Sequence, residues 1–123
     1  MLIDSSGWLE FFTEGPLASE YAAHLKHLPT VVTPAIVLYE VYKIIKRQRS
    51  EEEALAAIAQ MGKTRIIPLT DTIALTAADL SLAHRLGMAD AIIYATALTE
   101  GVKVVTSAAD LALLPDVTYL KKP

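Results

Sequence analysis

Two hydrophobic patterns alternate along the chain. Short runs rich in Val and Ile predict strands, and longer segments with apolar residues every three or four positions predict helices. The expected strands lie at residues 1–4, 30–33, 65–69, 102–106 and 117–120. The expected helices lie at residues 5–12, 16–28, 34–49, 50–61, 70–86 and 89–100, with a short helical segment at 107–114. Strands separated by such helices favour right-handed crossovers, so we expect an α/β fold whose parallel sheet is covered on both faces.

Residue types at the helix ends support these boundaries. Pro34 suits the first turn of a helix, and Ser50 with Glu53 matches a capping box. Gly87 and Gly101 stand where the last two long helices should end. In parallel α/β sheets the functional site lies at the carboxyl ends of the strands. The polar residues that follow the strands are therefore the candidates for function.

Composition narrows the class of protein. The 123 residues are enough for one domain with a real core, which we place at residues 1–123. Apolar residues make up 53% and charged residues 20%, so the chain is not disordered. A net charge of −3 speaks against binding of nucleic acid by bulk positive charge, but it does not exclude a local basic patch.

Cellular location is indicated only by what the sequence lacks. The absence of cysteine excludes a thiolate zinc site and fits a reducing compartment. The N-terminus has no signal-peptide pattern, and no apolar run reaches the length of a membrane span. We therefore expect a cytoplasmic protein without a membrane partner.

Four acidic residues occupy positions that suit a site better than a solvated surface. Asp4 ends the first predicted strand, and Asp110 follows the strand at 102–106 by four residues. Asp90 begins an apolar helix, and Glu40 has apolar neighbours one turn before it and one turn after it. Glu40 therefore projects from the buried stripe of its helix. All four can converge at one edge of the sheet.

Each acid also has a structural explanation. Asp4 and Asp90 could cap the helices that they precede, and Asp110 could form a capping box with Ser107. Glu40 lies in mid-helix, so a buried ion pair with Lys or Arg is its main alternative. Taken together, clustered carboxylates repel one another and take up protons unless a cation holds them. Oxygen ligands without Cys or a nearby His favour Mg²⁺ or Mn²⁺, and such sites act on phosphate esters.

Four segments resemble a known family. They are "LIDSS", "LYE", "ADAIIYATAL" and "VVTSAADLALLP", at residues 2–6, 38–40, 89–98 and 104–115. Their order and spacing, along essentially the whole chain, resemble the PIN-domain ribonucleases, and most closely the VapC-type toxins of toxin–antitoxin pairs. The resemblance implies a three-layer α/β/α sandwich with a short parallel sheet. It also implies a Mg²⁺- or Mn²⁺-dependent endoribonuclease that acts as the toxin of a type II system.

The resemblance assigns roles to individual residues. Asp4, Glu40 and Asp90 match the family's first three acids, which would bind the metal and take part in catalysis. Ser6 and Thr106 match polar positions that support the site.

The match is imperfect at the fourth acid. Ala108 stands at the family's usual first acidic position of the segment, and Leu111 replaces the usual aromatic. Asp110 matches only the second acid. As a fourth catalytic and metal-binding residue, Asp110 could bind the ion directly, act through water, or only cap a turn.

Basic residues gather near the end of the helix that carries Glu40. Lys43, Lys46, Arg47 and Arg49 either complement the helix C-terminus or form an RNA-binding patch beside the acids. Without such a patch, an acidic protein would bind RNA poorly.

The resemblance also implies protein partners. Family members commonly bind their antitoxin as a peptide that blocks the site, and they are commonly homodimers. The aromatic side chains expected in the core, some of which could line an antitoxin groove, are Trp8, Phe11, Phe12 and Tyr21.

Three other functions are also compatible with the sequence. A PIN nuclease in RNA processing or repair would share the same acids but would lack an adjacent antitoxin gene. A degenerate PIN domain, suggested by the altered "TSAADL" segment, would bind RNA or protein without cleavage and would not bind Mn²⁺. A receiver domain would need paired acids after the first strand and a lysine on a late strand, and "MLIDSS" offers only one acid.

Overall fold

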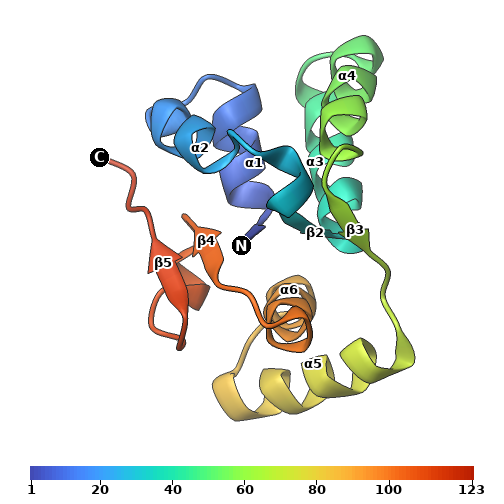
Figure 1. The fold of residues 1–123 in the computed structure, drawn as a ribbon, viewed down its shortest axis with the longest axis vertical. Helices are drawn as coiled ribbons and strands as arrows, with labels where there is room; N and C mark the ends of the chain where they lie inside the picture. The colour runs from blue at the N-terminus through green and yellow to red at the C-terminus, as the bar shows by residue number, and fades with distance from the viewer.

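The computed structural model, which describes residues 1–123, confirms the α/β class with a parallel sheet (Figure 1). Five strands in the order β3-β2-β1-β4-β5 pair in parallel throughout. The strands are β1 (Leu2–Ile3), β2 (Val32–Pro34), β3 (Arg65–Ile67), β4 (Val104–Thr106) and β5 (Val117–Tyr119). The helices are α1 (Ser5–Phe12), α2 (Ala18–His24), α3 (Ala35–Gln48), α4 (Glu51–Met61), α5 (Asp71–His84) and α6 (Met88–Glu100). Two short 3₁₀ turns are η1 (Leu28–Thr30) and η2 (Ala109–Leu111).

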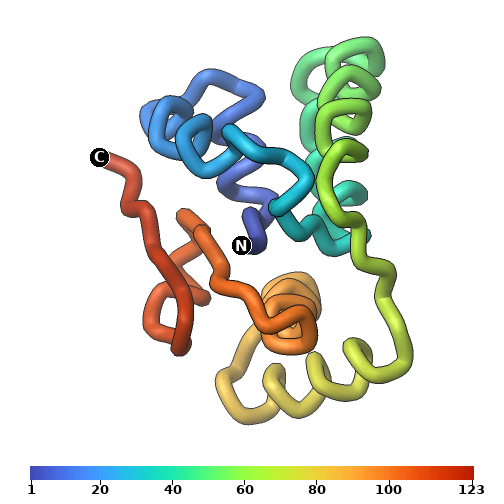
Figure 2. The backbone as a smooth tube through the Cα atoms, in the orientation of Figure 1, coloured from blue at the N-terminus to red at the C-terminus, as the bar shows by residue number.

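The helices form two layers around the sheet, which confirms the three-layer sandwich. Helices α1 to α4 lie on one side and α5 and α6 on the other (Figure 1). The chain runs from β1 outward to β2 and β3, then returns to β4 on the other side of β1. Figure 2 shows this return, with the start of the chain in the middle of the molecule. Because right-handed crossovers in opposite directions use opposite faces, the loops after β1 and β4 diverge there, and such a switch point creates a crevice.

The core lies along the three central strands. Every residue of β1, β2 and β4 is buried, whereas the edge strands β3 and β5 are partly exposed. Trp8 and Tyr21 are fully buried, as expected, and Phe11 and Phe12 pack against the core while remaining partly exposed. None of the helices combines the length and apolar character that a membrane crossing requires.

Local capping explains where the helices begin and end. The Ser50 hydroxyl accepts from the Glu53 amide at 3.1 Å, and Gly101 ends α6 in the left-handed conformation, both as predicted. The α5 boundary differs, because the helix ends at His84 and its C-cap, Arg85, is left-handed at φ 56°. Gly87 instead precedes α6 as its N-cap.

Two predicted helices are shorter in the structure. The helix expected at residues 16–28 is confined to α2, and η1 follows it around Pro29. Because proline lacks an amide hydrogen and restricts the residue before it, a helix does not continue through this position. The helix expected at residues 107–114 is only the turn η2.

Candidate active site

Asp4 lies at the centre of a hydrogen-bond network that joins the ends of β1 and β4. The Ser6 hydroxyl donates to its Oδ1 at 2.7 Å, and the Thr106 hydroxyl donates to its Oδ2 at 2.6 Å. The Gly7 amide donates to Oδ1 at 3.3 Å, so Asp4 also caps α1. The capping explanation is thus correct but incomplete, because the carboxylate also binds the nearby Ser6 hydroxyl and the Thr106 hydroxyl, which is distant in sequence.

The network leaves one acceptor position of Asp4 unused. A carboxylate offers about four lone-pair positions, roughly two on each oxygen. Oδ1 accepts two hydrogen bonds and Oδ2 accepts one. The remaining lone pair on Oδ2 is the position at which Asp4 could bind a cation.

No basic side chain of the protein compensates the charge of Asp4. The residue is 2% exposed, and none of the ion pairs of the chain includes it. Burial raises the pKa of the Asp4 carboxyl, although the hydrogen bonds from Thr106, Ser6 and Gly7 act in the opposite direction. An uncompensated carboxylate of this kind favours a proton or an external cation.

Glu40 on α3 is a second acid whose carboxylate lacks a compensating partner. It is half-buried, its Oε1 is buried without a hydrogen-bond partner, and no ion pair reaches it. The structure therefore contradicts the buried ion pair as an explanation of Glu40. Burial raises the pKa of the Glu40 carboxyl, the nearby Ser5 hydroxyl lowers it, and the charges of Asp4 and Asp90 raise it further.

Asp90 lies in the first turn of α6, two residues beyond the helix start. The N-cap is Gly87, so the capping explanation of Asp90 is wrong. The side chain is half-buried. Burial raises the pKa of the Asp90 carboxyl, and the charges of Asp110 and Asp4 raise it further. The charge of Asp4 thus acts on both Glu40 and Asp90, and the charge of Asp110 acts on Asp90, so the four acids lie in one electrostatic neighbourhood.

Asp110 is exposed, and it belongs to the turn η2. The N-cap of this turn is Ala108, without a side-chain hydrogen bond, so the predicted capping box with Ser107 is wrong. The charge of Asp110 adds to burial in raising the pKa of the Asp90 carboxyl, so the two acids interact electrostatically. Its exposure makes it the most weakly held of the four acids.

The residues fit a divalent cation by their chemistry, although they do not form a closed cage. No three acidic side chains lie close enough together to coordinate one ion as they stand. The free lone pair on Asp4 Oδ2 and the unpartnered Glu40 Oε1 are nonetheless the donors that a hard cation prefers. Mg²⁺ commonly takes one or two carboxylates and completes its shell with water, so this set suits Mg²⁺ or Mn²⁺.

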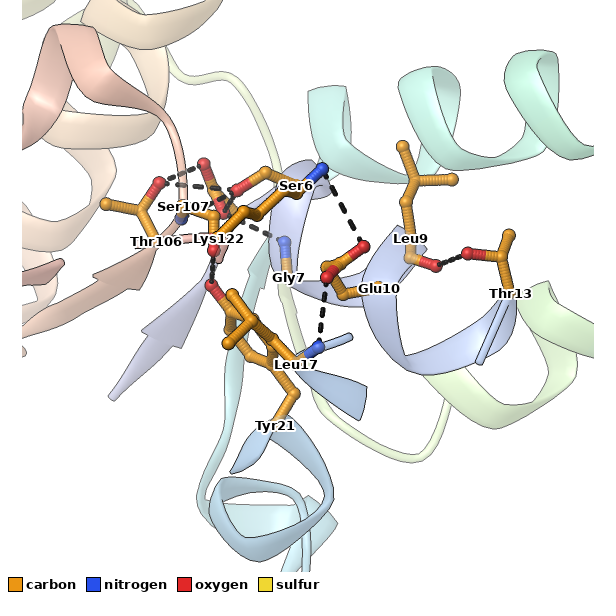
Figure 3. A network of polar contacts seen from close by, with 11 residues as sticks. Ser6, Gly7, Leu9, Glu10, Thr13, Leu17, Tyr21, Thr106, Ser107 and Lys122 are labelled. Carbon is orange, nitrogen blue, oxygen red and sulfur yellow. Dashed lines mark hydrogen bonds and ion pairs between the residues drawn. The ribbon is translucent and has the colours of Figure 1, made fainter. Parts of the chain in front are cut away.

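Two polar residues of the network were not expected at the site. Tyr21, assigned to the core, directs its hydroxyl to the Ser107 Oγ at 2.7 Å (Figure 3). The Ser107 amide in turn donates to the Ser6 hydroxyl at 2.9 Å. A tyrosine is apolar over most of its surface, so its hydrophobic position in α2 gave no indication of a polar role.

The basic residues near the end of α3 are exposed, but they are not equally available. Lys46 pairs with Glu51 at 3.6 Å, and Arg49 pairs with Glu53 at 3.6 Å. Helix α4 therefore partly neutralises the patch. Lys43 donates to the Tyr39 hydroxyl at 3.2 Å. Lys43 and Arg47 have no carboxylate partner, and thus their charges are available to a ligand.

With the fold and the acids described, similarity identifies the family. A model of the PIN domain family matches residues 1–116. The chain belongs to the PIN domain family, as the four sequence segments indicated.

Solved structures share the fold at low sequence identity. A toxin–antitoxin complex from Klebsiella pneumoniae matches with a TM-score of 0.82 and 24% identity, covering 98% of each chain. The Mycobacterium tuberculosis toxin VapC20, described as cleaving the sarcin–ricin loop, matches with a TM-score of 0.72 and 22% identity over 90% of each chain. VapBC2 from Rickettsia felis, bound to a promoter DNA fragment, matches with a TM-score of 0.77 and 16% identity over 98% of this chain and 96% of the other. No curated protein sequence matches the chain significantly. The fold is therefore that of VapC-type toxins.

Proposed function

We propose that the protein is a Mg²⁺- or Mn²⁺-dependent endoribonuclease of one domain, residues 1–123, that acts in the cytoplasm as the toxin of a type II toxin–antitoxin system. One observation carries the proposal. Asp4 is buried at the switch point of a PIN fold, held by three hydrogen bonds, with one lone pair free and no cation from the chain. The like charges of Glu40, Asp90 and Asp110 nearby increase the need for a cation there.

The roles of the acids follow from their environments. Asp4, the most rigidly held, would fix the position of the ion through Oδ2. Glu40 and Asp90 would supply the other protein ligands, and exposed Asp110 would contribute through water. A bound divalent ion supplies a water of lowered pKa and stabilises charge that develops on the phosphoryl oxygens. Glu40 or Asp90, both half-buried carboxylates, would be the residue that accepts a proton during the reaction.

RNA would approach over the end of α3. Phosphate contacts position a nucleic acid, and they require cations that are not already paired. Lys43 and Arg47 meet this condition, whereas Lys46 and Arg49 would first have to leave Glu51 and Glu53. We therefore assign the larger share of phosphate binding to Lys43 and Arg47.

A cognate antitoxin is the proposed regulatory partner. Related folds occur in complexes described as toxin–antitoxin pairs. On this chain, Phe11 and Phe12 line an open pocket of about 360 Å³ between α1, α3 and α4, with Arg49 and Glu53 at its edge. An apolar peptide segment with flanking charges would suit this pocket.

A homodimer is also part of the proposal. Leu75 and Leu82 on α5 are 70% and 84% exposed, and they lie on the helix layer opposite to the basic patch. Apolar side chains of this size in one helix favour burial against a second copy. Sedimentation at increasing protein concentration should show a dimer, and a monomer at all concentrations would contradict this part of the proposal.

The decisive test is cleavage of a mixed tRNA and rRNA pool by the purified protein. We expect cleavage with Mn²⁺, no cleavage with EDTA, and no cleavage by Asp90→Asn with Mn²⁺. Equal activity in all three reactions would indicate a contaminating nuclease. No cleavage in any reaction, together with no Mn²⁺ binding by the folded protein, would instead favour a degenerate PIN domain, which Ala108 at the usual acidic position also suggests.

A further inference from the structure

The Tyr21 hydroxyl stands at the far end of a hydrogen-bond chain that reaches Asp4. It bonds to the Ser107 Oγ at 2.7 Å, the Ser107 amide donates to the Ser6 Oγ at 2.9 Å, and the Ser6 hydroxyl donates to Asp4 Oδ1 at 2.7 Å. Figure 3 shows Tyr21, Ser107 and Ser6 pointing toward one another from three different segments. The chain thus links α2 to the acid at the end of β1 through the turn after β4.

The packing beside α1 leaves room for the Tyr21 ring at this position. The ring is fully buried, and a Cβ atom at Gly7 would overlap it. Any residue other than glycine at position 7 would therefore displace Tyr21. Burial, with the Asp4 charge as a smaller contribution, raises the pKa of Tyr21 to about 12, so the hydroxyl stays neutral and can keep its hydrogen bond at physiological pH.

Counting hydrogens shows why Ser107 affects Asp4. Ser6 and Thr106 each have one hydroxyl hydrogen, and each gives it to Asp4. Their oxygens are then oriented by the amides that donate to them, Ser107 to Ser6 and Ala108 to Thr106, both at 2.9 Å. Both amides belong to the turn after β4. The position of that turn therefore decides whether both hydroxyl groups can hold Asp4 at once.

We propose that Tyr21 is a positioning residue, which fixes the turn at residues 106–108 through Ser107 and thereby leaves one lone pair of Asp4 Oδ2 aimed at the cation. This inference rests on the proposed function, since it concerns the same acid. It adds Tyr21 on α2 to the residues that determine metal binding. The others are the four acids and the hydroxyl groups of Ser6 and Thr106. Tyr21 touches neither the ion nor the RNA in this role.

The test compares Tyr21→Phe with Tyr94→Phe in the full chain. Tyr94 is a matched control, because it is also buried and its hydroxyl makes one hydrogen bond, to the Pro115 carbonyl at 2.9 Å. It lies on α6, the helix of Asp90, so the control also reports general loosening near the site. Two readouts are used, amide hydrogen exchange at Ser107 and Ala108 without metal, and the Mn²⁺ dissociation constant by calorimetry.

We expect Tyr21→Phe to speed exchange at both amides and to raise the Mn²⁺ dissociation constant by about three- to tenfold, as expected for loss of one hydrogen bond. Tyr94→Phe should change neither quantity more than about twofold. The variant Ser107→Ala should match Tyr21→Phe, and the double variant should add little, because both remove the same link.

Unchanged exchange or unchanged Mn²⁺ affinity in Tyr21→Phe would overturn the inference, as would an equal effect of Tyr94→Phe. If the wild-type protein binds no Mn²⁺, the proposed function fails. The exchange rates at Ser107 and Ala108 would then still decide whether Tyr21 fixes the turn.

Discussion

Asp4 and Glu10 are two buried carboxylates, six residues apart, with opposite surroundings. Glu10 in α1 is 6% exposed, accepts from the Leu17 amide at 3.1 Å, and pairs with the Lys122 ammonium at 3.7 Å. Asp4 is 2% exposed and has three hydrogen bonds but no basic partner. Figure 3 shows Lys122 and Leu17 both directed at Glu10.

The difference separates an acid whose charge the chain compensates from one whose charge it does not. Glu10 closes the loop between α1 and α2, and Gly15 leaves room for its carboxylate there. Its charge is compensated within the chain. Asp4 is at least as deeply buried, yet the chain supplies it only with neutral donors, so its charge is available to an external cation. Burial alone therefore does not single out a candidate metal ligand, and the missing basic partner is what makes Asp4 one in the proposed function.

The largest expected effect is on catalysis. Asp4→Asn should reduce RNA cleavage with Mn²⁺ by at least about 1000-fold, equivalent to about 4 kcal/mol of transition-state stabilisation, because the amide removes the charged ligand. Glu10→Gln should retain activity within about threefold, since its charge does not serve the site. The measurement is the initial rate of cleavage of a defined RNA, with folding of both variants checked by circular dichroism. Equal losses in the two variants would erase the distinction between these acids.

The sequence pointed to Asp4 as a candidate but gave no indication of the surroundings of Glu10. Asp4 could be selected because it ends an apolar strand, where the carboxyl ends of a parallel sheet gather polar residues. Glu10 carried no such indication, because its partners are a loop amide and a lysine more than a hundred residues away. Tertiary pairing across this distance leaves no periodic pattern in the sequence.

The fold was predictable because it depends on repeating patterns. The alternation of β-branched runs and helical segments determined the parallel sheet, and Ser50 and Gly101 marked helix ends by local chemistry. One failure occurred where a local side-chain bond decided, at Arg85, which is the C-cap of α5 two residues before Gly87. There the Ser81 hydroxyl donates to the Leu86 carbonyl at 2.7 Å and fixes the turn.

The second largest effect should be on stability. Glu10→Ala removes the acceptor of the buried Leu17 amide, and it should lower the free energy of unfolding by about 1–3 kcal/mol. Cleavage by the folded variant should be unchanged. Urea unfolding with EDTA measures the first quantity, and Glu20→Ala, at an exposed position of α2, is the control. A stability loss no greater than that of the control would show that Glu10 does not hold the loop.

A smaller effect on stability, of opposite sign, should follow from removing the charge of Asp90, which burial and the neighbouring acids destabilise. Because burial raises the pKa of Asp90 above its usual 3.8, the folded state binds more protons than the unfolded state above that pH. The metal-free protein should therefore lose stability as pH rises through the pKa of the unfolded and then of the folded state. Asp90→Asn should be more stable than the wild type at neutral pH by about 0.5–2 kcal/mol.

Urea unfolding with EDTA at several pH values checks this prediction. The advantage of Asp90→Asn should vanish below the usual pKa of 3.8, where the carboxyl is protonated in both states. Mn²⁺ should stabilise the wild type more than the variant, since a ligand that binds only the folded state raises stability. A variant less stable than the wild type at neutral pH would indicate that Asp90 is compensated in the metal-free protein, as Glu10 is.

The smallest effect should come from replacing Lys122, the cation that pairs with Glu10 and has no counterpart at Asp4. Lys122 is largely exposed, and its ammonium lies 3.7 Å from the buried carboxylate of Glu10. Solvent therefore screens the Lys122 charge, as it does in a surface ion pair. Lys122→Met should lower the free energy of unfolding by about 0.5–1 kcal/mol, and the loss should shrink in about 1 M salt, where screening is strong. Lys121→Met is the matched control, because its neighbour Lys122, and not Lys121, makes the pair. If both variants lose the same amount of unfolding free energy, the Leu17 amide alone holds Glu10. Glu10 and Asp4 would then differ in their hydrogen-bond donors and not in whether a cation of the chain compensates their charge.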